Sequence, residues 1–362
     1  MAGFEGISWA SKQMRYTLDD REFTLLGPDS KVCAVSRSIH YGLFLAFEGI
    51  RFYCFRDDSW NLQVSFLGWD RNLDRFRRGI SFNLGSQQQH FVPTMEELET
   101  LFIDRFFRAP EMRAFFEEMA DMGAQGYLRP FTVDEDQSIG VTFPKKPSIR
   151  AVAARYDRYL GEPFSGVVIP DYVRAIGVNG TGCLKLGINY LISIKAVDMA
   201  KTILPEAASA LMLDDRPHLP LRDRVITEWD TSCCLIALSD DSIIRIPESP
   251  LILPSVTISG ITTILKDMGV KIDERDITYG ELLDRVERDE VVAICSIGTA
   301  GILNRCDELL LVDTDHTTLG TFRAKKDHPL HKKLGEARTT YWNIYRGEAP
   351  VPDGMKLFTY EL

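Results

Sequence analysis

The stretch Cys183-Leu184-Lys185-Leu186-Gly187-Ile188-Asn189-Tyr190 places one lysine inside an otherwise apolar run. Burying an unpaired ammonium group costs free energy unless the group is neutralised or covalently engaged. A desolvated lysine suits Schiff-base chemistry, in which the free amine attacks an aldehyde and later moves a proton. The alternative that these residues leave open is a lysine that reaches solvent at the edge of a strand.

Composition excludes several classes of protein. The chain has 362 residues, 45% of them hydrophobic, which suggests two domains with ordinary cores. Its net charge of −10 leaves no basic surplus for a phosphate backbone, so we do not expect a nucleic acid partner. The sequence contains no run of about twenty apolar residues that would predict a membrane span, and its start does not resemble a signal peptide. We therefore expect a cytoplasmic protein without a membrane partner.

The seven cysteines indicate reduced thiols. They show no C-x-x-C spacing, and Cys233 and Cys234 are adjacent, which disfavours a disulfide framework or a thiolate zinc site. The six histidines are scattered, and His328 and His331 stand beside two lysines in an expected solvated helix start. We expect no metal site.

Local patterns outline the elements. Thr94-Met95-Glu96-Glu97 is a capping box before the periodic apolar residues Leu98, Leu101, Phe102 and Phe106, which predicts a helix in a smaller first domain. Residues 161–182 are rich in Gly and Pro and read as an interdomain connection. We place the boundary near residue 170, giving a small domain over 1–170 and a large domain over 171–362. In the large domain, 291–296 predicts a strand and 259–268 a helix that Gly269 ends.

Two other kinds of site are excluded by their motifs. The glycines at 177, 180 and 182 suggest a phosphate loop, but Lys185 does not follow a glycine directly and no Ser or Thr follows it. No G-x-S-x-G segment is present to hold a hydrolase nucleophile.

Several segments resemble, in the same order, those of the class IV pyridoxal-phosphate aminotransferases, above all the branched-chain amino acid aminotransferases. The segment from Lys185 to Tyr190 resembles the family's K-x-G-G-N-Y, and Ile226-Thr227-Glu228 resembles its pyridine-binding segment. The other likenesses are His40-Tyr41-Gly42, Phe47-Glu48-Gly49-Ile50-Arg51, residues 71–76, Tyr127-Leu128-Arg129-Pro130, LPSVT at 253–257, IGTAG at 297–301, and a last helix within 328–348. The resemblance implies an α/β protein of fold type IV, with a small α+β domain and a larger pseudo-barrel domain.

The resemblance also implies pyridoxal 5'-phosphate as cofactor. Lys185 would hold it and act as acid and base, Glu228 would face its pyridine nitrogen, and Tyr190 would bond its phenolic oxygen. Its phosphate would lie against Arg75, Thr299 and the backbone of Val256 and Thr257 at a helix N-terminus. Three of these residues also have an ordinary structural explanation: core packing for Tyr190, a solvent-facing strand position for Glu228 and a solvated helix face for Arg75.

Substrate residues follow from the same resemblance. Thr231, Thr299 and Ala300 match the positions that hold the amino acid carboxylate, and Tyr41, Phe47, Arg51, Tyr127 and Arg129 match the side-chain pocket. Arg129, and after it Arg51, is our candidate for the distal carboxylate of glutamate. The implied reaction transfers an amino group between a hydrophobic, branched-chain-like L-amino acid and 2-oxoglutarate in a homodimer whose partner subunit closes part of the site.

Departures from the family pattern leave alternatives open. Trp229 and Asp230 replace two small residues after Glu228, and would narrow the pocket or repel a carboxylate if both side chains pointed into it. Ser255 replaces a glycine, which matters if that position requires a positive φ. The alternatives are a specialised enzyme of the same scaffold, such as a D-amino acid aminotransferase or an aminodeoxychorismate lyase-like enzyme, and a non-catalytic binding protein.

Overall fold

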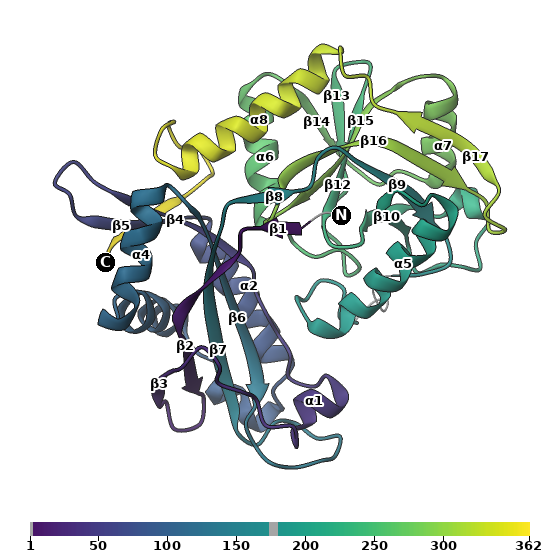
Figure 1. Ribbon diagram of the computed structural model, residues 1–362. Coiled ribbons are helices and arrows are strands. Elements are labelled where there is room, and N and C mark those ends of the chain that lie inside the picture. The colour runs from purple at the N-terminus through teal and green to yellow at the C-terminus, as the bar shows by residue number, and fades with distance from the viewer. Residues whose placement is uncertain (1–2, 174–179) are drawn as a thin grey trace.

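The computed structural model describes residues 3–173 and 180–362, and Gly177 of the excluded phosphate loop lies outside these ranges. Within the described residues the chain forms two large sheets and a small two-stranded sheet, with helices packed around the large sheets (Figure 1). The small sheet pairs β1 (Gly3–Glu5) with β8 (Arg158–Leu160) in antiparallel fashion.

The first large sheet is antiparallel throughout its seven described strands, in the order β18-β5-β4-β6-β7-β2-β3. Its strands are β2 (Ser8–Thr17), β3 (Phe23–Leu26), β4 (Ile50–Arg56), β5 (Leu62–Leu67), β6 (Gln125–Asp134), β7 (Pro147–Tyr156) and β18 (Leu357–Glu361). Because β18 comes from the C-terminal end of the chain, this sheet joins the two ends of the sequence.

Helices of the first half cover this sheet. They are α1 (Arg37–Tyr41), α2 (Trp69–Phe82), the 3₁₀ helix η1 (Ser86–Phe91), α3 (Met95–Thr100), the π-helical η2 (Leu101–Phe107) and α4 (Pro110–Met122). The predicted capping box is confirmed, since Thr94 Oγ1 accepts from Glu97 N and the Glu97 carboxylate accepts from Thr94 N. The four periodic apolar residues are all buried, as expected.

The second large sheet closes into a barrel. Its path is β11-β10-β9-β16-β15-β12-β13-β14, and an additional pairing of β11 with β12 closes a ring. The strands are β9 (Phe164–Ile169), β10 (Ala207–Leu213), β11 (Ile226–Trp229), β12 (Cys233–Leu238), β13 (Ser242–Arg245), β14 (Lys271–Glu274), β15 (Val291–Gly298), β16 (Ile302–Val312) and β17 (Thr318–Arg323), which pairs with β16. The predicted α/β fold with a pseudo-barrel is confirmed.

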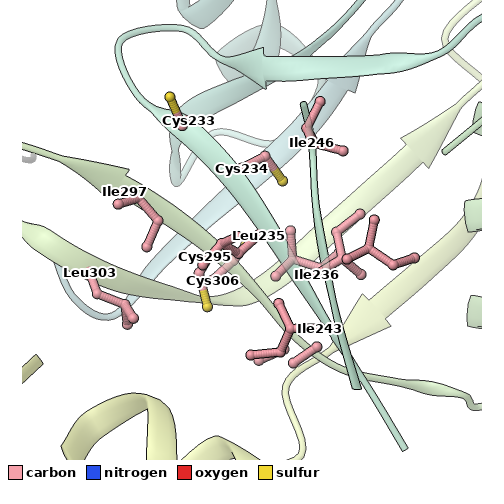
Figure 2. Packing of buried hydrophobic residues seen from close by; sticks show 14 of the residues in the cluster. Cys233, Cys234, Leu235, Ile236, Ile243, Ile246, Cys295, Ile297, Leu303 and Cys306 are labelled. Carbon is pink, nitrogen blue, oxygen red and sulfur yellow. The ribbon is translucent and has the colours of Figure 1, made fainter. Parts of the chain in front are cut away.

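Buried cysteines are part of the barrel's apolar core (Figure 2). Cys234 and Cys295 lie on the neighbouring strands β12 and β15, and Cys306 lies on β16. None of the seven cysteines, all of them among the described residues, forms a disulfide. Burial raises the pKa of the Cys234, Cys295 and Cys306 thiols, which therefore stay protonated and pack as small apolar groups.

Helices surround the barrel. They are the 3₁₀ helix η3 (Gly187–Asn189), α5 (Tyr190–Ile203), the 3₁₀ helix η4 (Leu221–Asp223), α6 (Val256–Asp267), α7 (Tyr279–Glu287) and α8 (Pro329–Tyr345). Helix α6 begins three residues before the predicted start because Ser255 caps it, and Gly269 follows its end with a φ of +75°. Helix α8 is the expected last helix.

Two expectations about segments need correction. Part of the predicted connection at 161–182 is the buried strand β9, whose run Val167-Val168-Ile169 packs between β10 and β16. His331 is buried rather than solvated, because it lies on the inner face of α8 beside Arg305. The strands do not divide at one point of the chain, since β9 lies in the barrel and β18 in the first sheet, and the boundary near residue 170 stays a prediction.

The described residues contain neither a helix suited to span a membrane nor a cluster of side chains suited to hold a metal ion. None of their helices has the length and apolar character needed to cross a membrane. They contain no group of three or more His, Cys, Asp or Glu side chains arranged to hold a metal ion.

We expect Trp229→Ala to lower the free energy of unfolding by about 3 to 5 kcal/mol, because it removes a large side chain from the barrel. The Trp229 indole is fully buried, its Nε1 donates to Cys295 O at 3.1 Å, and its ring packs edge-on against Phe164 at 5.2 Å. Urea unfolding followed by circular dichroism measures the change. Trp60→Ala is the control, since Trp60 is 74% exposed. Equal losses in the two variants would contradict the assignment of Trp229 to the core.

Candidate functional site

The predicted lysine and tyrosine lie together at the start of α5. The 3₁₀ turn of η3 brings Tyr190 back toward Lys185, whose Nζ donates to Tyr190 Oη at 3.1 Å. Lys185 is partly exposed, because the apolar run is irregular chain followed by a 3₁₀ turn, with Ile188 55% exposed. The amine is therefore held by a hydroxyl group and is not fully buried.

Phe47 connects this pair to the first sheet. Its N–H donates to Lys185 O at 3.0 Å, and its ring lies 5.1 Å from Lys185 Nζ and 5.1 Å from the Tyr190 ring. On another side, the guanidinium of Arg129 lies 4.7 Å from the centre of the same ring. One aromatic side chain thus contacts three of the predicted site residues.

Arg75 is clamped by a buried carboxylate. It projects from the buried face of α2, and its Nε and Nη2 donate to the two carboxylate oxygens of Glu48 at 2.7 and 2.6 Å. Its Nη1 donates at 2.5 Å to Pro254 O, just before α6. Burial disfavours the charge of Arg75, but the attraction of Glu48 outweighs burial and raises the pKa of the guanidinium.

The N-terminus of α6 lies at the same place. The Ser255 hydroxyl accepts from Ile258 N at 3.2 Å, so the first two N–H groups of the helix, at Val256 and Thr257, have no acceptor within the helix. Ser255 has a φ of −99°, so this position does not require glycine and the serine causes no strain. Val256, Thr257 and Thr299 line one small cavity of about 20 Å³. Arg75 lines a different pocket, which shares Val256 with this cavity.

Glu228 lies on β11 and is buried, with Cys233 opposite it on β12. The neighbouring Trp229 points into the barrel, as strand alternation requires, so it does not narrow a pocket on the Glu228 side. Asp230 is also occupied elsewhere: its Oδ1 accepts from Ser209 Oγ and from Ala210 N on β10. The narrowing considered from the sequence does not occur for Trp229.

Arg51 holds the turn between β15 and β16. Its Nε and Nη2 donate to Thr299 O at 3.1 and 2.6 Å, and Nη2 also donates to Ala300 O. Its Nη1 donates to Gln125 Oε1 at 2.8 Å and to Tyr156 Oη. All five N–H groups of Arg51 thus have protein acceptors, which favours Arg129 as the residue for a distal carboxylate.

Arg129 and Tyr127 lie two residues apart on β6. Arg129 Nη2 donates to Tyr127 Oη at 2.5 Å, and the guanidinium lies 5.1 Å from the centre of the Tyr127 ring. The Tyr127 hydroxyl lies directly over Gly49, where a Cβ atom would overlap it. Glycine is therefore required there for Tyr127 to approach.

The structure leaves two predicted substrate residues apart from this group. Tyr41 on α1 is 45% exposed and packs against the ring of His40, and Thr231 is exposed in the turn between β11 and β12. The roles of all the predicted site residues stay predictions.

Sequence reasoning missed several residues around the site. Glu48 lies within the segment Phe47-Glu48-Gly49-Ile50-Arg51, where a carboxylate among apolar residues is a usable signal of a buried charge. Tyr156 and Tyr345 had no such signal: the first accepts from Arg51 and the second donates to Arg51 O from α8. Tyr159 is partly buried near Asp230, and burial raises its pKa.

The closed barrel and the antiparallel sheet together give the architecture called fold type IV. No model of a known protein family matches the chain. The branched-chain-amino-acid aminotransferase of Haemophilus influenzae is 27% identical over 278 residues, which cover 74% of this chain and 72% of that protein. The chain is thus similar over most of its length to an enzyme of the kind that its motifs resemble.

Solved structures agree in fold. The branched-chain aminotransferase from Thermoproteus uzoniensis with norvaline has a TM-score of 0.67 and 20% identity, covering 93% of this chain and 96% of its own. The branched-chain amino acid aminotransferase from Thermobaculum terrenum in its PLP-form has a TM-score of 0.67 and 14% identity, covering 94% of this chain and 95% of its own. At these identities the likeness establishes the fold alone.

We expect Gly49→Ala to lower the free energy of unfolding by about 1 to 3 kcal/mol, because the added methyl group must displace the Tyr127 hydroxyl. Gly27→Ala is the matched control, since a Cβ atom at Gly27 meets no atom within 4 Å. Urea titration of both variants measures the difference. An unchanged free energy of unfolding in Gly49→Ala would contradict the prediction, since Tyr127 would then move aside without loss of stability.

Proposed function

We propose that the protein is a pyridoxal-phosphate-dependent aminotransferase that moves an amino group between a hydrophobic, branched-chain-like L-amino acid and 2-oxoglutarate. The observation that carries this proposal is the Lys185 amine, hydrogen-bonded to Tyr190 and in contact with Phe47, in a chain with the fold type IV architecture. The related aminotransferases support the same reaction class.

The residues present fit the cofactor. Two free helix N–H groups, the Thr257 and Thr299 hydroxyls, and the two guanidinium N–H groups that Arg75 has left over suit a phosphate group. A carboxylate at Glu228, buried in the barrel wall, suits a protonated ring nitrogen. When bound there, the cofactor would act as an electron sink for the carbanion formed at the substrate Cα.

The protein residues would then divide the work. Lys185 would bind the cofactor aldehyde through its amine and, once released, take the proton from the substrate Cα and return it. Tyr190 would keep that amine in place through its hydroxyl group. Glu228 would hold a proton at the ring nitrogen, and Arg75, Thr257 and the start of α6 would keep the ring from shifting during the reaction.

Substrate residues are proposed on the same basis. The carboxylate common to all amino acids would bind at the turn that Arg51 holds, with Thr299 and Ala300, and at Thr231. Phe47 and Tyr127 would provide an aromatic wall for an apolar side chain. The Arg129 guanidinium lies 4.7 Å from the centre of the Phe47 ring and 5.1 Å from that of the Tyr127 ring. Among the described residues, the Tyr127 hydroxyl is the one acceptor found for this guanidinium. Arg129 therefore has N–H donors available for the distal carboxylate of glutamate.

A homodimer would complete the site. Exposed apolar side chains occur on α1 and before it, on the loop between β6 and β7, and on α5 and the turn before it: Val35, Ile39, Tyr41, Ile139, Val141, Phe143, Ile188, Leu191 and Ile194. A second copy that covered these elements would bury these exposed apolar side chains. Tyr41 would then act on the partner subunit's site. The cytoplasmic location stays a prediction.

We expect purified protein with pyridoxal phosphate to show a cofactor absorbance band that Lys185→Ala abolishes or shifts. Lys195→Ala, an exposed lysine on the same helix as Tyr190, should leave the band unchanged. Branched-chain L-amino acids should convert the wild-type band to that of the aminated cofactor, and 2-oxoglutarate should reverse the change. A band without a response to these donors would favour the specialised enzyme or a D-amino acid substrate; no band would favour the binding protein.

We expect Arg129→Gln to lower kcat/KM for glutamate by roughly 10- to 100-fold, the value of a charge-assisted hydrogen bond, while kcat/KM for leucine changes less than about threefold. Steady-state kinetics with the two donors measures the ratio. Arg78→Gln on the exposed face of α2 is the control. Equal losses with both donors would mean that Arg129 supports the pocket without reading the distal carboxylate.

A further inference from the structure

We infer that Glu48 is an internal counter-ion that neutralises Arg75 when no anion is bound and shares that cation with a phosphate group when one binds. This inference rests on the proposed function, because it concerns the same phosphate site. The carboxylate of Glu48 is fully buried and both of its oxygens bind the Arg75 guanidinium.

The bonding of Arg75 leaves room for both the carboxylate and a phosphate. A guanidinium has five N–H groups, and Glu48 and Pro254 take three of them: Nε, one on Nη2 and one on Nη1. Among residues 3–173 and 180–362, one N–H group on each of the two Nη atoms is therefore left without an acceptor. A phosphate group can accept from these two N–H groups while the Glu48 carboxylate stays bonded to Nε and Nη2 of the same guanidinium.

Glu48 is itself fixed in position by the backbone. Its N–H donates to Pro130 O at 2.9 Å, and its Oε1 accepts from Gly49 N at 2.8 Å. Phe47 before it contacts Lys185, and Gly49 after it admits Tyr127. The counter-ion is thus part of the segment that carries the lysine contact and the substrate wall.

The Glu48 carboxylate and an incoming anion are expected to weaken each other's binding to Arg75. Without the carboxylate, the partner that Arg75 keeps among the described residues is the neutral carbonyl of Pro254, and a buried cation left in this way strongly destabilises the protein. A phosphate dianion supplies the missing negative charge. A protein without the Glu48 charge should therefore gain more from phosphate than the wild type does, because in the wild type the two negative groups share one cation.

The test measures thermal unfolding of the full chain, without cofactor, over a series of inorganic phosphate concentrations, with chloride at matched ionic strength. We expect Glu48→Gln to raise the unfolding constant by about 100-fold without phosphate. We expect the apparent Kd for phosphate to fall by roughly tenfold relative to wild type, because like-charge repulsion is removed.

The chain offers a matched control. Glu135 binds Arg150 in the same two-pronged way, with bonds of 2.8 and 2.9 Å, in the same half of the protein. Glu135→Gln should destabilise the chain and leave its response to phosphate unchanged. Glu48→Asp keeps the negative charge and should bind phosphate as the wild type does, so it is a second control. If Glu48→Gln folds only when phosphate is present, that result itself supports the inference.

Two results would overturn the inference. Phosphate could stabilise wild type and Glu48→Gln equally, which would make the pair purely structural. Phosphate could instead bind Glu48→Gln more weakly, which would make Glu48 only a positioning residue for Arg75. Failure of the proposed function is distinguishable, since it would appear as the absence of a Lys185-dependent absorbance band with pyridoxal phosphate in the wild type.

Discussion

The buried ion pair of Glu48 and Arg75 is the interaction on which the rest of the site depends. A cation on α2 and an anion before β4 can both leave water only because each satisfies the other through two short bonds. The remaining edge of the guanidinium then binds the carbonyl of Pro254 and ties α2 to the start of α6. The Arg75 guanidinium therefore connects helix α2, the segment before β4 and the start of α6. Phe47 and Gly49, on either side of Glu48, are held in position by the same contacts.

A second constraint comes from the closed barrel. Its interior must be filled, and the side chains of Trp229, Phe164 and the buried cysteines fill it. Strand alternation then turns Glu228, the neighbour of Trp229, to the opposite side of β11. The packing of the barrel and the placement of the carboxylate are thus two consequences of one strand register.

Much of this could be predicted from the sequence where the signal is local. The capping box at Thr94, the end of α6 at Gly269 and the strand at 291–296 depend on neighbours within a few residues, and all three were predicted correctly. The pairing of Lys185 with Tyr190 is also local, because five residues and a 3₁₀ turn separate them. The burial of His331 and the strand at Phe164–Ile169 were missed, since both depend on partners distant in the chain.

The sequence by itself determined the order of the motifs, the barrel-forming class of fold and the residue types available for chemistry. Only the tertiary structure decided which of those residues are committed to one another. Arg51 is separated from Thr299 by 248 positions, and Arg75 from Pro254 by 179. No local pattern therefore indicates that every N–H group of Arg51 has an acceptor, or that Arg75 keeps two N–H donors. The physical reason is that hydrogen bonds and ion pairs saturate: a group's availability depends on which partners the fold brings within about 3 Å of it.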